Sequence, residues 1–258
     1  MNGKRSWMVG GAALAIVLGV ALVAHATVNA GIAGWWLFNE SYGITAHDAS
    51  GGGNDGTLVS TAVFAQDPTR GNVLFINGAS GEVDFPDSNA FRPQVGTISV
   101  WVNPQENRLA DIVRMPTNLL INCNRSGDFY AYGLRVTDKG TPVAILANDS
   151  LKTCGRKPQI VLNGSARMVK PGQWTHLVMR WDGSTLSLFA NGKLAGSTPY
   201  EANADSGLSY HGSSPFKVGA ALWDMNAGYL EYFGMVSDLR VFSRALSDAE
   251  VQSIFNGE

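Results

Sequence analysis

Charged side chains are scarce in this sequence: they make up 16% of 258 residues, and no run of lysine or arginine occurs. The 19 basic and 21 acidic residues give a formal net charge of −2, which argues against binding nucleic acid through its phosphates. Sequence signals for helices are also rare, whereas 30 glycines are spread along the chain. Low charge with many glycines favours a β-rich globular protein that has many turns.

Motifs of common catalytic and nucleotide-binding sites are absent. Neither H-E-x-x-H nor G-x-S-x-G occurs, and no glycine-rich phosphate loop follows a strand and opens a helix. Of the four histidines, His176 lies in an alternating stretch close to Trp174, where a packed histidine is far more common than a general base. Nucleotide chemistry and the hydrolases that carry these motifs therefore have no support in the sequence.

Cysteine is nearly absent, since Cys123 and Cys154 are the only two. In an oxidising compartment such a pair predicts a disulfide, whose loop of roughly 30 residues would stabilise the fold by about 3–4 kcal/mol. A metal site is less favoured, because neither cysteine has a second cysteine or a histidine at ligand spacing. A catalytic thiol would need a histidine partner, and the sequence leaves that alternative open.

The first 30 residues are typical of a secretory signal peptide with a short lead. Lys4 and Arg5 precede an apolar run from about Trp7 to Ala24, and small residues then offer cleavage sites that end at Ala26 or at Ala30. An uncleaved membrane anchor is the alternative, because the run is near the lower limit for spanning a bilayer.

Export defines the mature chain and its location. Cleavage after Ala26 would leave 258 − 26 = 232 residues and, without Lys4 and Arg5, a net charge of −2 − 2 = −4. We expect residues 31–258 to form one domain that is secreted or held in the periplasm or at the cell surface, with no membrane contact after cleavage.

Short alternating runs separated by turns indicate antiparallel strands. Residues 96–104 read GTISVWVNP and alternate in polarity, which predicts a strand with two different faces. Farther along, predicted strands Trp174–Trp181 and Ser184–Ala190 are joined by Asp182-Gly183, and Asn191-Gly192 leads into a third strand. Asp-Gly and Asn-Gly tolerate the positive φ of a type I′ turn, so this stretch predicts an antiparallel meander.

One short helix is predicted at the C-terminal end, after a strand over Met235–Phe242. Ser247 and Glu250 form a capping box, Leu246 and Val251 fit a hydrophobic staple, and Gly257 follows as the C-terminal stop signal. Many short strands with a single helix predict an all-β fold, a two-sheet antiparallel β-sandwich of the jelly-roll kind.

Four stretches together resemble the laminin-G-like domains of the concanavalin A-like lectin/glucanase fold. In chain order they read WWLFNESYGITAHDASGGGNDGTL, GTISVWVNP, GQWTHLVMRWDGSTLSLFANGKLAGS and GMVSDLRVFSRALSDAEVQSIFNG. The resemblance extends from about Gly34 to Gly257, with a poor match over about Glu106 to Lys170. It implies two antiparallel sheets whose first and last strands lie close together.

The resemblance also implies a structural calcium ion at the glycine-rich loop HDASGGGNDG. Its ligands would be Asp48 and Asn54 from the loop and Asp238 from the last strand, together with backbone carbonyls around Gly51 to Gly56. Calcium prefers six to eight oxygen ligands in flexible geometry, which such a loop can supply. Asp55 is an alternative to Asn54. A turn without metal, in which Asp and Asn bond their own backbone, explains the same residues.

The same fold hosts glycoside hydrolases, and one segment approaches their pair of carboxylates. GEVDFPDS places Glu82, Asp84 and Asp87 along a predicted strand. Asp87 is one methylene shorter than the expected Glu, and Pro86 interrupts the strand. A laminarinase-type hydrolase is therefore the less favoured alternative, and we expect no catalytic residues.

Carbohydrate binding on such sandwiches pairs an aromatic platform with polar side chains. The preferred candidates lie in the predicted loop of ALWDMNAGYLEYFG, and a second set lies in GDFYAYGLRV, where alternation puts two tyrosines on one face. Packing of these aromatics in the core is the alternative. The candidates are Trp223, Asn226 and Tyr229 in the first set and Tyr130, Tyr132 and Arg135 in the second.

These observations predict a secreted, non-catalytic, lectin-like module that binds a polysaccharide or glycan and holds a structural calcium ion. The alternative within the same fold is a module for protein adhesion or surface assembly, which would bind cell-surface proteins without a sugar site. Exposed aromatics in a groove would favour the first function, and a flat patch elsewhere would favour the second.

Overall fold

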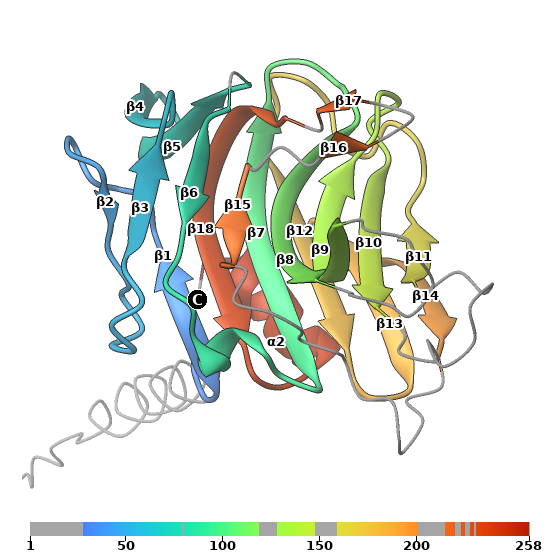
Figure 1. The fold of residues 1–258 in the computed structure, drawn as a ribbon. Helices are drawn as coiled ribbons and strands as arrows, with labels where there is room; N and C mark the ends of the chain where they lie inside the picture. Colours follow the sequence, from blue (N-terminus) through green and yellow to red (C-terminus); the bar gives the residue numbers. More distant parts are fainter. Residues whose placement is uncertain are drawn as a thin grey trace, which may run out of the picture.

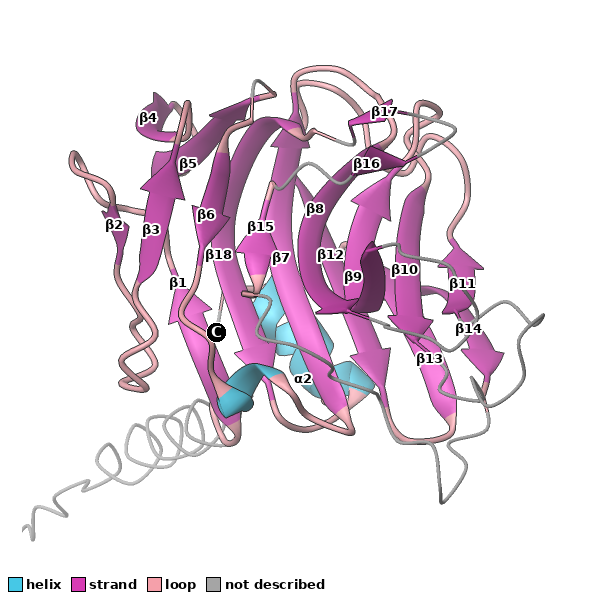
Figure 2. Ribbon diagram, viewed as in Figure 1, coloured by secondary structure: helices cyan, strands magenta, loops and turns pink. Residues whose placement is uncertain are grey.

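The computed structural model describes residues 28–78, 80–118, 128–147, 159–200, 215–219, 223–224, 228–229 and 231–257. These residues form two antiparallel sheets that face each other, and helix α2 (Asp248–Phe255) covers the outer side of one sheet (Figure 1). Figure 2 shows how little of the described chain is helical. The predicted β-sandwich with a short C-terminal helix is confirmed.

The first sheet, sheet A, carries the helix on its outer face. Its strands are hydrogen-bonded in the order β14-β13-β12-β7-β18-β5-β4, and β1 also pairs with β18. Their bounds are β1 (Ile32–Trp36), β4 (Val63–Asp67), β5 (Gly71–Asn77), β7 (Gly96–Pro104), β12 (Thr175–Trp181), β13 (Thr185–Ala190), β14 (Lys193–Pro199) and β18 (Phe233–Phe242).

The second sheet, sheet B, has the order β11-β10-β9-β8-β15-β6-β3-β2. Four of its strands come from the stretch between Glu106 and Lys170, where the resemblance to laminin-G-like domains is poor. The bounds are β2 (Thr45–Ala46), β3 (Gly56–Val59), β6 (Glu82–Asp84), β8 (Ala110–Asn118), β9 (Asp128–Val136), β10 (Pro142–Ala147), β11 (Gln159–Asn163) and β15 (Lys217–Val218). Outside the sheets are the 3₁₀ turn η1 (Asn89–Phe91) and the pair β16 (Trp223–Asp224) and β17 (Gly228–Tyr229).

Alternation of side chains builds the core between the sheets. In β7, Ile98, Val100 and Val102 belong to the main hydrophobic cluster, as the sequence pattern predicts for one face. Sheet B contributes the facing layer, which includes Val83 and Leu134. Because side chains on a strand point alternately to the two sides, the residues between these core positions lie on the outer faces of the sandwich.

The predicted meander is confirmed as strands β12, β13 and β14. Asn191 and Gly192 have φ values of 50° and 74°, which matches the predicted type I′ geometry. At the other turn only Gly183 has a positive φ, because Asp182 instead accepts hydrogen bonds from the backbone N–H groups of Ser184 and Thr185.

The two ends of the described chain lie side by side. β1 pairs antiparallel with β18, so that Trp35 is opposite Arg240. Beyond β18, Ser247 and Glu250 form the predicted capping box of α2. Leu246 and Val251 of the predicted staple are both buried in the cluster under the helix, and Gly257 has a φ of 91°.

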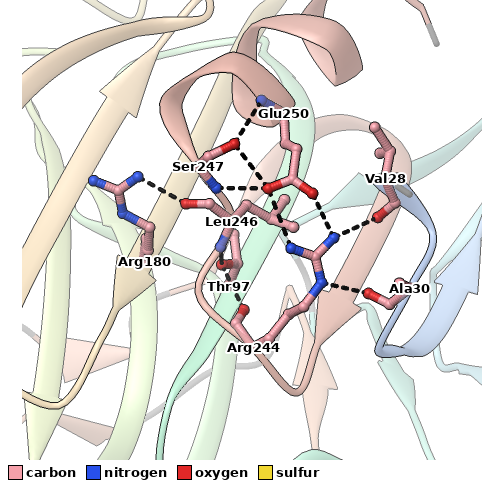
Figure 3. A network of polar contacts seen from close by, with 8 residues as sticks. All are labelled: Val28, Ala30, Thr97, Arg180, Arg244, Leu246, Ser247 and Glu250. Carbon is pink, nitrogen blue, oxygen red and sulfur yellow. Dashed lines mark hydrogen bonds and ion pairs between the residues drawn. The ribbon is translucent and has the colours of Figure 1, made fainter. Parts of the chain in front are cut away.

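Arg244 connects the start of the described chain to the helix (Figure 3). Its guanidinium donates to the carbonyl oxygen of Val28 at 3.1 Å and to that of Ala30 at 2.5 Å, and it also pairs with Glu250 at 2.7 Å. The Val28 side chain is only 3% exposed and packs in the cluster under α2. The chain is therefore part of the folded domain from Val28 onward.

Several predictions lie outside the described residues. These are residues 1–27 of the predicted signal peptide and lead (residues 1–30), the cysteines Cys123 and Cys154, and Asn226. Export, its cleavage site and the disulfide stay predictions. In the part of the chain that the structure describes, no helix is long and apolar enough to cross a membrane.

Candidate functional site

One carboxylate organises the glycine-rich loop after β1. Asp48 Oδ1 accepts hydrogen bonds from the backbone N of Trp35 at 3.0 Å and of Ser50 at 2.9 Å. Its Oδ2 accepts from Asn54 N at 3.0 Å and from Asn54 Nδ2 at 3.4 Å. Burial alone would raise the pKa of Asp48, but the hydrogen bonds from Ser50, Asn54 and Trp35 outweigh it and lower the pKa.

Asp238 lies in β18 at the point where the pairing with β7 shifts register, between Ser237 and Arg240, and its own φ is 47°. Its Oδ1 accepts from the indole Nε1 of Trp35 at 2.7 Å and from Arg240 Nε at 2.9 Å, and its Oδ2 accepts from Arg240 Nη2 at 3.0 Å. The Arg240 guanidinium also lies over the Trp35 ring, 4.6 Å from its centroid. Trp35 is therefore the residue that connects Asp238 to the loop of Asp48.

In this arrangement the predicted ligands do not fit a calcium ion. Four N–H donors occupy the lone pairs of the Asp48 carboxylate, and Arg240 bonds both oxygens of Asp238. Among the described residues, no three His, Cys, Asp or Glu side chains group as metal ligands. The alternative Asp55 accepts from Asp48 N at 2.8 Å. Calcium binding stays a prediction. In the structure, the loop is held by hydrogen bonds from backbone N–H groups to the Asp48 carboxylate.

The predicted aromatic loop contains a small hairpin. β16 and β17 pair antiparallel, with Trp223 opposite Tyr229 and Asp224 opposite Gly228. Two residues of the predicted sugar-binding patch are therefore direct neighbours across this hairpin, which Figure 1 shows at the upper end of the view. Asn226 belongs to the connection between the two strands and lies outside the described residues.

Tyr132 of the second aromatic set is a core residue. It is fully buried in the main cluster, stacks on Trp181 and donates a hydrogen bond of 2.7 Å to the carbonyl oxygen of Phe91. Packing therefore explains this tyrosine. Arg135 lies on the opposite side of β9, on the outer face of sheet B.

The carboxylates of the hydrolase-like segment are paired with cations. Lys217 Nζ lies 2.7 Å from Glu82 Oε1 and 2.6 Å from Asp84 Oδ1, and Asp87 pairs with Arg92 after the end of β6. A retaining glycosidase needs two carboxyl groups that face the glycosidic bond, whereas each carboxylate here faces a cation of the protein. The segment thus forms an ion-pair network.

This network is part of a larger feature that the sequence did not reveal, which we call the charged row. Cross-strand register places its residues on the outer face of sheet B: Arg114 is opposite Lys217, and Lys217 is opposite Asp84. Beside them, Arg135 Nε donates to Asp111 Oδ1 at 2.8 Å. The row comprises Glu82, Asp84, Asp111, Arg114, Arg135 and Lys217.

A β-bulge brings Arg114 to this face. The register of β8 against β9 shifts between Asp111 and Val113, and both Ile112 and Val113 are buried in the main core. Asp111 and Arg114 therefore share the outer face although they are three positions apart. Simple alternation would have put them on opposite faces, so no local pattern in the sequence could have indicated the row.

Ser99 and His176 form another unpredicted pair, on the outer face of sheet A. Ser99 Oγ lies 2.7 Å from His176 Nε2, and both residues are fully buried. Burial lowers the pKa of His176 to about 3, so the ring is neutral near pH 7. Trp101 and Phe255 pack against the ring. Because these two aromatic rings pack against it, the pair belongs to the packing between sheet A and α2.

A comparison with models of protein families identifies the family of the chain. The model described as the concanavalin A-like lectin/glucanases superfamily matches residues 77–252, which is more than half of the chain. The chain belongs to this superfamily. The matched part runs from the end of β5 into α2 and contains the whole charged row. A comparison with curated proteins finds no match.

Solved structures of binding domains from several other proteins share the fold. The binding domain of Paraclostridial Mosquitocidal Protein 1 has a TM-score of 0.62 at 16% identity, covering 89% of this chain and 52% of that one. The botulinum neurotoxin serotype D ligand-binding domain in complex with N-acetylneuraminic acid has a TM-score of 0.65 at 13% identity, with 91% and 53% covered. The chain thus spans about half the length of these two toxin domains.

A third similar structure is close to this chain in size. Domain 4 of AbnA, a GH43 extracellular arabinanase from Geobacillus stearothermophilus, was solved in complex with arabinotriose; its TM-score is 0.57 at 17% identity, covering 86% of this chain and 97% of that one. At such low identities, these similarities show the shared sandwich of the superfamily and nothing about ligands.

Proposed function

We propose that the chain is a non-catalytic glycan-binding module whose polar contacts come from the charged row. The observation that carries this proposal is the row itself, in which charged side chains stand next to one another across β9, β8, β15 and β6. Sugar ligands need a few well-placed polar groups on a rigid surface, and residues on paired strands are held rigidly. Superfamily membership and similarity to domains solved with arabinotriose or N-acetylneuraminic acid support it.

The pairing of Lys217 supports binding over hydrolysis. Its ammonium contacts both carboxylates of β6, which are the nearest approach in the sequence to a catalytic pair. Charged side chains that are already fixed by ion pairs are suited to donate and accept hydrogen bonds with sugar hydroxyls. A hydrolase would instead need two carboxyl groups that face the glycosidic bond.

The β16–β17 hairpin supplies the aromatic part of the proposed site. Trp223 and Tyr229 are opposite each other in its register, and aromatic residues combine a large apolar surface with a polar group. We assign stacking on a sugar ring to these two residues and polar contacts to the charged row.

The test is a glycan array with the exported protein, covering chitin, cellulose, α- and β-glucans, arabinans, pectins and sialylated glycans. The expected result is binding to at least one class, with an affinity that falls tenfold or more in Trp223→Ala or Tyr229→Ala. Tyr42→Ala is the matched control, because Tyr42 is 87% exposed and far from the hairpin in the sequence. Absence of binding to every class would overturn the proposal, as would release of reducing sugar from a bound polysaccharide.

Protein adhesion remains a second candidate because of one observation. Tyr42 and Ile44, in the turn before β2, are 87% and 63% exposed, which is unusual for two large apolar side chains so close together. Under this alternative the double variant Tyr42→Ser, Ile44→Ser would abolish attachment to cells, whereas the hairpin variants would leave attachment unchanged.

Export completes the proposal. We propose that the apolar N-terminal segment is removed, that the module works outside the cytoplasm, and that Cys123 and Cys154 form a disulfide there. Support comes from the chemistry of the sequence and from Val28, which packs under α2 and lies two positions after Ala26, the earlier of the two proposed cleavage sites. Mass spectrometry of the exported protein before and after reduction tests both modifications.

A further inference from the structure

Arg114 differs from the other cations of the charged row, because its partners are missing. Lys217 pairs with Glu82 and Asp84, and Arg135 pairs with Asp111. Arg114 is only 7% exposed, yet its Nε and Nη1 atoms are buried and make no hydrogen bond. No described carboxylate forms an ion pair with it.

A buried guanidinium without partners is an unusual feature in a folded protein. Removing a charge from water is strongly unfavourable unless hydrogen bonds and an opposite charge compensate for it. Buried polar groups are nearly always hydrogen-bonded, so an exception calls for an explanation such as a bound ligand. The donors of Arg114 therefore indicate a missing acceptor with negative charge.

The carboxylates of the row cannot supply this charge as they stand. Two cations, Lys217 and Arg135, already form ion pairs with the three carboxylates Glu82, Asp84 and Asp111. Moving any one of them to Arg114 would break an existing ion pair on the same face. An acceptor from outside the row would complete the hydrogen bonds of Arg114 without that loss.

The surroundings of Arg114 define what kind of acceptor fits. On one side it is opposite Lys217, whose cation discourages any further cation from approaching. On the other side it is opposite Gly133, which has no side chain that could accept a hydrogen bond from the guanidinium. A planar guanidinium has two edges with parallel N–H donors, Nε with Nη2 and Nη1 with Nη2, and either edge matches the two oxygens of a carboxylate.

Resting on the proposed glycan-binding function, we infer that Arg114 binds the carboxylate of an acidic sugar residue, such as a uronic or sialic acid. The ion-paired groups of the row then bond the hydroxyls of the same sugar, and the charge of Arg114 selects acidic over neutral glycans. Sulfated glycans share the negative charge and can also offer two oxygens to a guanidinium, so they are the competing source of an anion.

The test compares three forms of one oligosaccharide by isothermal titration calorimetry with the exported protein: the carboxylated form, its carboxyl-reduced neutral form and a sulfated form. We expect the carboxylated oligosaccharide to bind at least tenfold more tightly than either of the others. In Arg114→Gln this preference disappears, whereas affinity for the neutral form changes less than threefold. Arg167→Gln, a substitution of the same type at an exposed arginine of the described chain, leaves the preference intact.

The outcomes separate the inference from the function on which it rests. If wild-type protein binds neutral and carboxylated forms equally, or binds the sulfated form best, the acidic-sugar inference is wrong while glycan binding stands. If no glycan binds, both are wrong. Should Arg114→Gln fail to fold, the wild-type comparison of the three oligosaccharides still decides. Arg114→Lys keeps the positive charge but lacks the parallel N–H donors of a guanidinium. A preference for the carboxylated form that survives unchanged in Arg114→Lys contradicts recognition of two oxygens.

Discussion

Trp35 and Asp238 are 203 positions apart in the chain, and the indole Nε1 of Trp35 donates a hydrogen bond of 2.7 Å to Asp238 Oδ1. The backbone N of the same tryptophan donates to Asp48. One residue of β1 therefore connects the glycine-rich loop to the last strand. The connection lies where the first and last strands pair, and it consists of hydrogen bonds between protein groups.

Replacement of Asp48 by alanine should destabilise the domain by about 2–3 kcal/mol. The change removes the acceptor of backbone N–H groups from Trp35, Ser50 and Asn54, and partly buried donors without acceptors are costly. Chemical unfolding in urea measures the loss. Asp55→Ala is the control: its carboxylate is exposed, so a loss below about 1 kcal/mol is expected. Equal losses for the two variants would show that Asp48 does not organise the loop.

Calcium can be tested on the same proteins. Because the carboxylates of Asp48 and Asp238 are already bonded to N–H donors, we expect the unfolding midpoint of wild-type protein to be unchanged by excess chelator. A ligand specific for the native state would raise stability by about 2.7 kcal/mol at a hundredfold excess over its Kd. A midpoint that falls with chelator in wild type, and not in Asp48→Ala, would instead establish the calcium site and require the loop to rearrange around the ion.

Glu250 should make the C-terminal helix sensitive to acid. Partial burial alone would raise its pKa, but hydrogen bonds from Arg244 and Ser247 lower the pKa from 4.5 to about 2. A lowered pKa stabilises the fold above the unfolded value, near pH 4.5, and this contribution is lost as the pH falls toward 2. Wild-type stability should therefore decline over that window. Glu250→Gln should be less stable than wild type at pH 7, with a difference that narrows toward pH 2, as thermal unfolding at several pH values would reveal. A constant difference would contradict the role of the charge.

Local patterns made much of the fold predictable. Alternation located β7 at its observed bounds, the Asn-Gly turn fixed the hairpin of β13 and β14, and the Ser247–Glu250 capping box marked the start of α2. Each of these signals depends on residues within a few positions of one another, where steric preference and hydrogen bonding act without the rest of the fold.

The candidate site was less predictable because it depends on contacts across strands. The bulge at Asp111 moves Arg114 to the outer face, and only the pairing of β8 with β15 brings Lys217 beside it. Alternation could group Tyr132 with its neighbours but could not tell the core from the outside. Asp238 pairs with Arg240 at a position where φ is positive inside a strand. The periodicity of the sequence does not indicate such a position.

The ion pairs of Lys217 predict that Lys217→Met and Lys217→Arg differ in stability. Lys217→Met should destabilise the domain by about 1–2 kcal/mol, because two half-buried carboxylates lose the cation that they share. Lys217→Arg keeps a cation at this position and should recover at least half of that stability. Urea unfolding of the three proteins is the measurement. If Lys217→Met were as stable as wild type, the ion pairs of Lys217 would contribute little to the free energy of unfolding, as is typical of surface ion pairs.

The packing of Val28 leads to a prediction of the mature N-terminus. Two cleavage sites are compatible with the sequence, after Ala26 or after Ala30. The second would remove the Val28 side chain from the cluster under α2 and the carbonyl groups that Arg244 bonds, so we expect an exported protein that begins at Thr27. Intact-mass measurement identifies the terminus directly. A form engineered to begin at Gly31 should be about 2–3 kcal/mol less stable than one that begins at Thr27, since it loses a buried valine and its hydrogen bonds. Val28→Ala in the longer form should lose about half of that difference. A natural terminus at Gly31, or equal stability of the two forms, would show that the contacts between Arg244 and the first residues contribute nothing to the exported fold.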